Sequence, residues 1–303
     1  MTSRCRIAAV TLGCAIALAR PARGAEVLKL RSTATLYADE QGVSLSVPQG
    51  VGCGGGATFV VADSGRGRVV RFEVSGALAQ TKGVVAVPEL AYPIRADVDA
   101  KGNLVVLDGK SHRIGRVGLD GKFAGWIDVP AADGSGAAVL RSFALDPAGR
   151  VYALDIAGHR IAVLSPSGAL ERSIAFPPDA GFPTDLTVDL RGTVYVVDGL
   201  RRTVYAARKD EKELSSFSKS LAEDLDYPSA IATDGSGHFF VADQNGGGIV
   251  LLGVDGSFRG RQSAYGWKEG YLRYPAGLCT NGRGLLIVAD RENQRVQVFS
   301  IGD

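Results

Sequence analysis

The chain has 303 residues, with 34 lysines and arginines against 32 aspartates and glutamates, so its formal net charge is +2. This balance, without a stripe of basic residues, argues against a nucleic-acid partner, and the chain has no run of about 18 apolar residues that would predict a transmembrane helix. The 40 glycines and the aromatic content of 7% are typical of an all-β chain with many turns.

The first 24 residues have the features of a secretory signal peptide. Arginines near the start precede the 13-residue apolar stretch Ile7–Ala19, and small residues lead to a cleavage point after Gly24. A lipoprotein signal ending at Cys14 is the alternative, with a shorter apolar stretch. We therefore expect residues 25–303 to be exported as one domain, to the periplasm or the cell exterior. Cleavage would remove four arginines and no acidic residue, which changes the net charge from +2 to −2.

A segment of about 45 residues recurs six times between Pro48 and the C-terminus. Each copy has an aspartate at the end of a short apolar run, and successive aspartates are 45, 47, 43, 45 and 47 residues apart. They are Asp63, Asp108, Asp155, Asp198, Asp243 and Asp290. A proline stands 15 residues before five of them, and Leu140 takes its place in the third copy. A second alternating run follows each aspartate, and such runs between turns predict strands.

The last copy resembles the NHL repeat family of β-propellers. Three motifs carry the resemblance: Pro-x-Gly-hydrophobic at Pro275–Leu278, Val-Ala-Asp at Val288–Asp290, and Asn-Gln-Arg-Val-Gln-Val-Phe at Asn293–Phe299. Together with six copies, the resemblance implies an all-β, six-bladed β-propeller of four-stranded antiparallel blades around a central channel. The last copy supplies only three strands, so we expect Val27–Leu36 to add the fourth. This closure would also cover an exposed sheet edge.

Cys53 and Cys279 are the only cysteines that follow the predicted signal peptide. They lie at offsets five and four from Pro48 and Pro275, on equivalent first strands, and so point to opposite strand faces. Because neighbouring blades present opposite faces to each other, we expect a disulfide between the first and last blades in an oxidising compartment. Two buried free cysteines are the alternative, since the same parity allows both side chains to point apart.

Polar residues that recur with the repeat predict structural roles. In four copies we expect the aspartate to pair with an arginine five residues later and to fix the intervening loop. These pairs are Asp63/Arg68, Asp108/Arg113, Asp155/Arg160 and Asp290/Arg295. Asp99, Asp146, Asp189, Asp234 and Asn281 open turns, and we expect them to cap those turns rather than to bind calcium, because each turn supplies one side chain only. His112 and His159 occupy equivalent loops and are expected to be loop residues rather than metal ligands.

Two features depart from the repeat and predict a working surface. Two residues after each repeat start, small side chains dominate, which leaves Arg95 and Asp185 as a charged pair near the channel mouth. A charge at a narrow mouth needs a partner or a ligand. The segment Tyr265–Tyr271 adds Tyr265, Trp267, Lys268 and Tyr271 outside the pattern, and Trp and Tyr are frequent in binding hot spots.

We therefore expect a ligand- or protein-binding or scaffolding module that uses its top face, the rim formed by the inner-strand starts and the loops between blades. A protein or a small molecule would bind there, through Arg95, Asp185, Tyr265, Trp267, Lys268 and Tyr271. The structural alternative is that Arg95 pairs with Asp97 or Asp185 and that Trp267 packs under its own loop.

An enzyme is the alternative function. A lactonase or lyase would use the channel with a divalent ion, for which Asp97, Asp185 and Asp189 are weak candidate ligands. These aspartates do not form a recognisable ligand set, and the channel-mouth histidines of lyases on this scaffold have no counterpart that we can place here. We therefore expect no catalytic residue and no cofactor.

Overall fold

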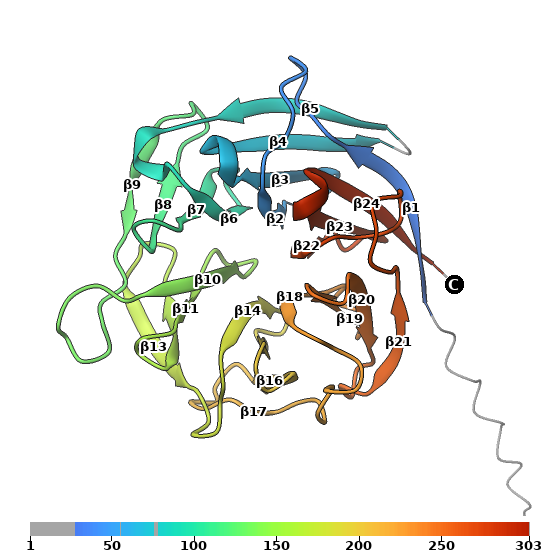
Figure 1. Ribbon diagram of the computed structural model, residues 1–303. Coiled ribbons are helices and arrows are strands. Elements are labelled where there is room, and N and C mark those ends of the chain that lie inside the picture. The colour runs from blue at the N-terminus through green and yellow to red at the C-terminus, as the bar shows by residue number, and fades with distance from the viewer. Residues whose placement is uncertain (1–27, 55, 76–77, 303) are drawn as a thin grey trace, which may run out of the picture.

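The computed structural model describes residues 28–54, 56–75 and 78–302, so the signal peptide expected at 1–24 lies outside the described residues. In this part of the chain, six four-stranded antiparallel sheets form blades around a central channel (Figure 1). The predicted six-bladed β-propeller is therefore confirmed. Of the described residues, only three short segments are helical, and all are 3-10 turns: η1 (Ser64–Arg66), η2 (Pro88–Leu90) and η3 (Arg291–Asn293).

Each of the first five blades runs from an inner strand at the channel to an outer strand, in chain order. Blade 1 contains β2 (Pro48–Cys53), β3 (Thr58–Asp63), β4 (Arg68–Ser75) and β5 (Leu78–Val85); blade 2 contains β6 (Pro93–Val98), β7 (Leu104–Asp108), β8 (Arg113–Val117) and β9 (Phe123–Ile127); blade 3 contains β10 (Leu140–Leu145), β11 (Val151–Asp155), β12 (Arg160–Leu164) and β13 (Leu170–Ala175). Blade 4 contains β14 (Pro183–Val188), β15 (Val194–Asp198), β16 (Thr203–Ala207) and β17 (Ser215–Ser216); blade 5 contains β18 (Pro228–Thr233), β19 (Phe239–Asp243), β20 (Gly248–Leu252) and β21 (Phe258–Gln262).

Blade 6 is completed by the N-terminal strand. It contains β22 (Pro275–Thr280), β23 (Leu285–Asp290) and β24 (Arg295–Gly302), and β1 (Lys29–Leu36) pairs with β24. The antiparallel register runs from Lys29 opposite Gly302 to Leu36 opposite Val296, and Figure 1 shows β1 lying along the outside of the last blade. The expected ring closure is confirmed, and the backbone of β24 is paired on both sides.

The hydrophobic core lies between neighbouring blades. In one cluster, Val51 and Phe72 of blade 1 pack with Ile287 and Val298 of blade 6, and all four side chains are fully buried or nearly so. Each strand presents alternate residues to its two neighbouring blades, which is why the middle strands are apolar on both faces. Burial in every blade therefore depends on the closed ring.

Every inner strand begins with a β-bulge. The register with the second strand shifts between the residue that starts the repeat and the residue two positions later, as between Pro93 and Arg95 in β6. The inner strands approach each other closely where glycine follows the bulge. A Cβ added to Gly50 would lie 2.5 Å from the carbonyl oxygen of Ile94, so the fold admits no side chain there.

The repeated aspartate ties its blade to the loop that enters the blade. In all six blades its carboxylate accepts a backbone N–H from that loop, as in the bonds from Ser46 to Asp63 (2.6 Å) and from Arg273 to Asp290 (2.7 Å). Three of the four expected arginine pairs are present: Arg68 with Asp63 (2.7 Å), Arg160 with Asp155 (3.0 Å) and Arg295 with Asp290 (2.6 Å).

The prediction that Asp108 pairs with Arg113 is wrong. The oxygen of Asp108 that corresponds to the arginine acceptor in the other blades receives the backbone N–H and the hydroxyl of Ser111, both at 2.8 Å. Arg113 instead lies 3.1 Å from Asp128 and stacks over the ring of Trp126 at 4.4 Å. The serine hydroxyl has thus replaced the guanidinium as the donor that fixes this loop.

Candidate functional site

The central channel holds two cavities that share one residue. The larger, about 610 Å³, opens at the rim of the turns between first and second strands and is lined by the outgoing halves of the inner strands. A smaller one of about 50 Å³ lies at the inner-strand starts. Arg95 of β6 contributes to the wall of both, so its side chain separates them.

Arg95 forms an ion pair with Asp185 of β14. The guanidinium Nη1 lies 3.5 Å from the carboxylate, and only 9% of Arg95 and 3% of Asp185 are exposed. Asp185 also accepts hydrogen bonds from the Ser142 hydroxyl (2.5 Å) and the Ile231 backbone N–H (3.1 Å). Asp185 therefore links blades 2, 3, 4 and 5 across the channel. Of the structural alternatives, the pairing of Arg95 with Asp185 is the one present.

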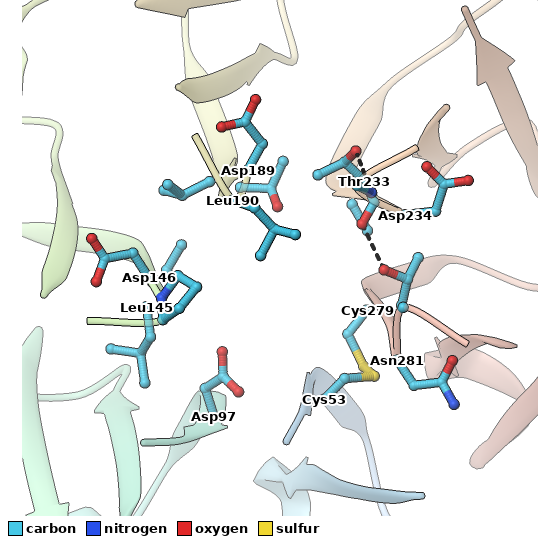
Figure 2. A pocket seen from close by; sticks show the side chains of 18 of the residues that line it. Cys53, Asp97, Leu145, Asp146, Asp189, Leu190, Thr233, Asp234, Cys279 and Asn281 are labelled. Atoms are coloured by element: carbon cyan, nitrogen blue, oxygen red, sulfur yellow. Dashed lines mark hydrogen bonds between the residues drawn. A yellow bond between two sulfur atoms is a disulfide. The ribbon is translucent and has the colours of Figure 1, made fainter. Parts of the chain in front are cut away.

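Asp97 stands two residues further along β6, on the wall of the larger cavity. Its carboxylate accepts the backbone N–H of Val98 at 2.8 Å. Burial raises the pKa of Asp97 from 3.8 to about 6, although the positive charge of Arg95 and the Val98 N–H both oppose that rise. Figure 2 shows the carboxylate directed toward the middle of the cavity.

The other acidic residues of this cavity serve their own turns. Asp189 accepts the backbone N–H groups of Arg191 and Thr193, and Asp146 receives the N–H and the guanidinium of Arg150. In Figure 2 the carboxylates of these turns point away from the middle of the cavity. The turn-capping role expected for these residues is confirmed, and Asp97 is left as the carboxylate that faces the interior.

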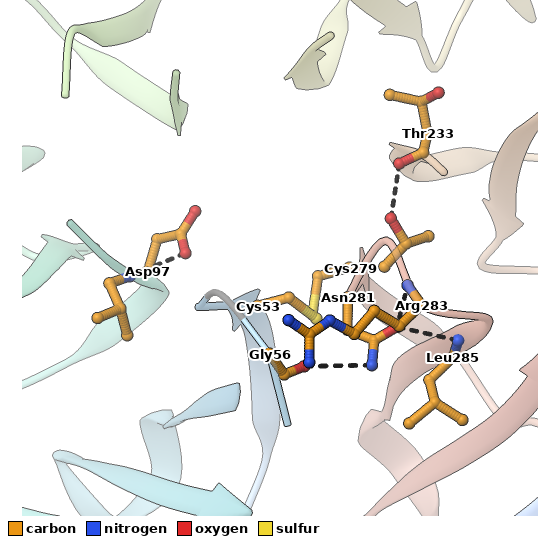
Figure 3. Close-up of a disulfide and its surroundings, with 10 residues drawn as sticks. Cys53, Gly56, Asp97, Thr233, Cys279, Asn281, Arg283 and Leu285 are labelled. Atoms are coloured by element: carbon orange, nitrogen blue, oxygen red, sulfur yellow. Dashed lines mark hydrogen bonds between the residues drawn. A yellow bond between two sulfur atoms is a disulfide. The ribbon is translucent and has the colours of Figure 1, made fainter. Parts of the chain in front are cut away.

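Cys53 and Cys279 are joined by a disulfide on the cavity wall, with their Cα atoms 5.6 Å apart (Figure 3). The bond connects the inner strand of blade 1 to that of blade 6. Beside it, the Asn281 side-chain amide donates to the carbonyl oxygen of Gly56 across the same seam, at 3.3 Å. The ring is thus closed at its inner edge by a covalent bond and at its outer edge by the pairing of β1 with β24.

The segment Tyr265–Tyr271 forms an exposed aromatic loop between β21 and β22. Trp267 is 75% exposed, Tyr265 51% and Tyr271 44%, so Trp267 does not pack under its own loop. Tyr37, which follows β1 and is 48% exposed, accepts a hydrogen bond from Arg295 Nη1 at 3.1 Å. We call Tyr37, Tyr265, Trp267 and Tyr271 the aromatic rim.

Buried polar side chains of β24 hold the backbone of this loop. Arg295 donates to the carbonyl oxygens of Lys268 (2.8 Å) and Tyr271 (2.9 Å), and Gln297 donates to Tyr271 (2.7 Å) and accepts the N–H of Gly270 (2.7 Å). Arg295 is 2% exposed and Gln297 is fully buried. The loop is therefore fixed mainly through its main chain, while its aromatic side chains remain exposed to solvent.

The predicted binding residues separate into two groups. Arg95 and Asp185 meet inside the channel, whereas Tyr265, Trp267, Lys268 and Tyr271 share the exposed loop and line neither channel cavity. Sequence reasoning missed Tyr37, Ser142 and the supporting roles of Arg295 and Gln297. Arg295 and Gln297 belong to the Asn293–Phe299 motif. The motif indicated that these two residues matter, but it did not indicate that they would hold the Tyr265–Tyr271 loop.

Within the described residues, no group of three or more His, Cys, Asp or Glu side chains could hold a metal ion. The weak candidates Asp97, Asp185 and Asp189 do not meet at one point, because Asp185 is engaged by neighbouring blades and Asp189 by its own turn. His112 and His159 both adopt left-handed backbone conformations (φ of 54° and 48°) in the loop before the third strand. No helix in this part of the chain is long and apolar enough to cross a membrane.

This geometry defines a closed six-bladed β-propeller with an ion pair inside its channel and an exposed aromatic loop at its rim. The sequence model of the NHL repeat matches residues 272–299, so the last blade carries an NHL repeat. A search of curated proteins finds no match.

Solved structures similar to this chain share its fold. A catalytically inactive variant of virginiamycin B lyase from Staphylococcus aureus, with quinupristin, aligns at a TM-score of 0.64 and 12% identity, over 90% of this chain and 99% of that one. A streptogramin B lyase aligns at 0.62 and 13%, over 91% and 98%. A gluconolactonase from Xanthomonas campestris aligns at 0.62 and 14%, over 85% and 87%. At these identities the similarity is one of fold alone.

Proposed function

We propose that this protein is an exported binding propeller that docks a protein partner on the aromatic rim. The observation that carries the proposal is a loop whose main chain is fixed by buried side chains while its aromatic side chains are exposed. Every tyrosine or tryptophan that is exposed in the described residues belongs to this rim.

The arrangement suits binding because it lowers the cost of association. A docking loop that is already ordered loses little conformational entropy when it meets a partner. Trp and Tyr supply large contact areas with few rotatable bonds and dominate binding hot spots. Solvent-exposed apolar rings that do not pack on their own protein are typical of an interaction surface.

Charged groups around the rim favour a partner with both apolar and acidic groups. Arg273 stacks over Tyr265 at 5.8 Å and donates to its hydroxyl at 3.3 Å, and Arg291 lies 5.7 Å from the ring of Tyr274. Lys268 is exposed on the loop itself. Such cations at the border of an aromatic patch contribute to partner orientation and to the association rate.

Export is part of the proposal. The signal-peptide features of the first 24 residues and the disulfide between Cys53 and Cys279 both support an oxidising compartment. The solved lyases and the gluconolactonase share only the fold, and the channel aspartates other than Asp97 serve turns or neighbouring blades. We therefore favour binding over the metal-dependent enzyme, which measurement of the metal content of the purified protein would test.

The test compares the full chain with a Trp267→Ala, Tyr271→Ala double variant. The double variant, a control variant and the wild type are immobilised and exposed to the extracytoplasmic fraction of source cells. The recovered proteins are identified by mass spectrometry, and their binding is then measured by direct titration. Loss of two hot-spot rings should weaken binding by about 2 kcal/mol or more, roughly 30-fold. Leu119→Ala is the matched control, because Leu119 is 71% exposed and lies outside the rim.

The thermal stability of the double variant should stay close to that of the wild type, because Arg295 and Gln297 hold backbone carbonyls rather than the replaced rings. Equal recovery of the same partner by the double variant and the wild type would refute the proposed surface.

A further inference from the structure

Blade 2 departs from the repeat at two positions of its inner strand. In each inner strand, the positions two and four residues after the repeat start lie on the same face of the strand. The second positions are Gly50, Arg95, Ser142, Asp185, Ala230 and Gly277, and the fourth positions are Gly52, Asp97, Ala144, Thr187, Ala232 and Cys279. Blade 2 alone has charged side chains at both. Because four of the other five blades form the same strand with small residues at both positions, the fold does not require these charges.

Arg95 has donors that the protein does not use. Its Nε is buried and has no hydrogen-bond partner among the described residues, and its one ion pair, with Asp185, is long at 3.5 Å. A guanidinium carries five N–H donors, and a buried donor without a partner is costly. Arg95 is about nine-tenths buried and lines the 610 Å³ cavity. These donors are therefore available to an anionic group that enters the channel.

Asp97 supplies the opposite charge on the same wall. Residues two apart on a strand lie on one face, about 6.5 Å from each other along the strand. Arg95 makes its ion pair with Asp185 and not with Asp97, so the two side chains of β6 do not neutralise each other by direct contact. A positive and a negative group thus stand side by side, with Arg95 deeper in the blind cavity.

The rest of the wall carries both polar side chains, such as Thr187 and the turn aspartates, and apolar ones. Leu145, Ile231 and Leu278, together with the disulfide, line the cavity around the charged pair. The volume is within the range of about 300–1,000 Å³ that is typical of small-molecule sites. A small molecule would match this surface if it carried a carboxylate for Arg95, an amine for Asp97 and an apolar part for the apolar side chains of the wall.

We propose that the channel binds a small zwitterion of the amino-acid type, whose carboxylate is held by Arg95, whose ammonium is held by Asp97, and whose apolar side chain contacts the cavity wall. The ligand enters from the rim of the turns, because the Arg95–Asp185 pair closes the other end. This site is separate from the aromatic rim, so either proposal can fail without the other.

The test uses the purified, oxidised full chain in calorimetric titrations and thermal-shift assays at neutral pH. The probes are leucine, phenylalanine and two half-ligands of leucine: 4-methylpentanoate, which lacks the amine, and isopentylamine, which lacks the carboxylate. At least one amino acid should bind about tenfold or more tightly than either half-ligand, since each charge-assisted hydrogen bond contributes about 1.5–3 kcal/mol.

Two variants identify the groups. Asp97→Asn keeps the shape and the acceptor for Val98, and should bind leucine no more tightly than 4-methylpentanoate. Arg95→Lys keeps the positive charge but loses the planar guanidinium with its paired N–H donors. It should weaken the binding of leucine and of 4-methylpentanoate about tenfold. Leu119→Ala should behave as the wild type. Asp97→Asn alone decides the matter if Arg95→Lys fails to fold. Absence of binding by both amino acids at millimolar concentration, or unchanged binding in Asp97→Asn, would overturn the proposal.

Discussion

Replacement of Asp97 by asparagine should make the protein more stable, and only above about pH 4. Burial raises the pKa of this carboxyl from 3.8 to about 6, so the folded state binds the proton more tightly than the unfolded state does. The ionisable Asp97 therefore does not lower the free energy of unfolding below the unfolded pKa of 3.8. Between pH 3.8 and about 6 the free energy of unfolding falls progressively, and above about pH 6 the loss is complete. Asparagine removes that cost and retains the oxygen that accepts the Val98 N–H.

The magnitude follows from the size of the rise. At 1.36 kcal/mol for each pKa unit, a rise from 3.8 to about 6 corresponds to about 3 kcal/mol of unfolding free energy. For a chain of this size each kcal/mol changes the Tm by roughly 2–4 °C, so the Tm of Asp97→Asn should exceed that of the wild type by roughly 6–12 °C near pH 8. Near pH 4 the two proteins should melt together, since the carboxyl is then mostly protonated in the folded state.

Thermal unfolding followed by circular dichroism at several pH values measures this difference. Asp210→Asn is the control, because Asp210 is an exposed carboxyl outside the channel and its replacement should change the Tm little at any pH. The reasoning is refuted if Asp97→Asn is no more stable than the wild type near pH 8, or if its advantage is the same near pH 4.

Three further predictions concern the ring and the loop. Arg295→Met should lower the unfolding free energy by about 3–5 kcal/mol, measured in urea, because it leaves the buried Asp290 carboxylate without its cation and frees the aromatic loop; a loss below about 1 kcal/mol would contradict this. A Cys53→Ser, Cys279→Ser double variant should lose up to about 5 kcal/mol, since the bond spans 226 residues, and the reduced wild type should match it; equal urea midpoints for oxidised and reduced wild type would contradict this. Deletion of residues 28–36 should lower the Tm and promote aggregation, seen by light scattering, because it exposes the edge of β24; a deletion variant that melts like the wild type would show that the closure lies elsewhere.

The fold could be predicted because a repeat multiplies weak signals. One alternating run is ambiguous, whereas six runs with an aspartate at constant spacing specify the blade, and the missing fourth strand of the last copy then identifies its N-terminal partner. The absence of the pair between Asp108 and Arg113 could not be predicted from spacing, because Ser111, three residues after Asp108, competes for the same carboxylate oxygen. Spacing identifies which groups are near, and local competition decides which of them bond.

The candidate sites were predicted less completely for a geometric reason. Trp267 and its neighbours were found because they depart from the repeat, but the side chains that fix their loop come from β24, some 25 residues later in the chain. Such contacts depend on strand register and loop course, which the sequence pattern does not specify. The larger cavity was likewise missed. It is lined by the ends of all six inner strands and the turns that follow them, whereas the sequence pattern favoured the opposite mouth of the channel.

In a repeat protein, comparison of equivalent positions in the different repeats indicates whether the fold requires a given residue. Arg295 has equivalents in Arg68 and Arg160, each bonded to its blade's aspartate, so a structural role accounts for all three. Asp97 has small residues at the equivalent positions of the other blades, and its own burial opposes its ionisation. Five blades fold without a carboxylate at this position, so its cost cannot be assigned to the architecture. A partly buried charge that costs stability where the fold needs none is expected at a site that acts on a ligand. Asp97→Asn should then gain stability and lose ligand binding.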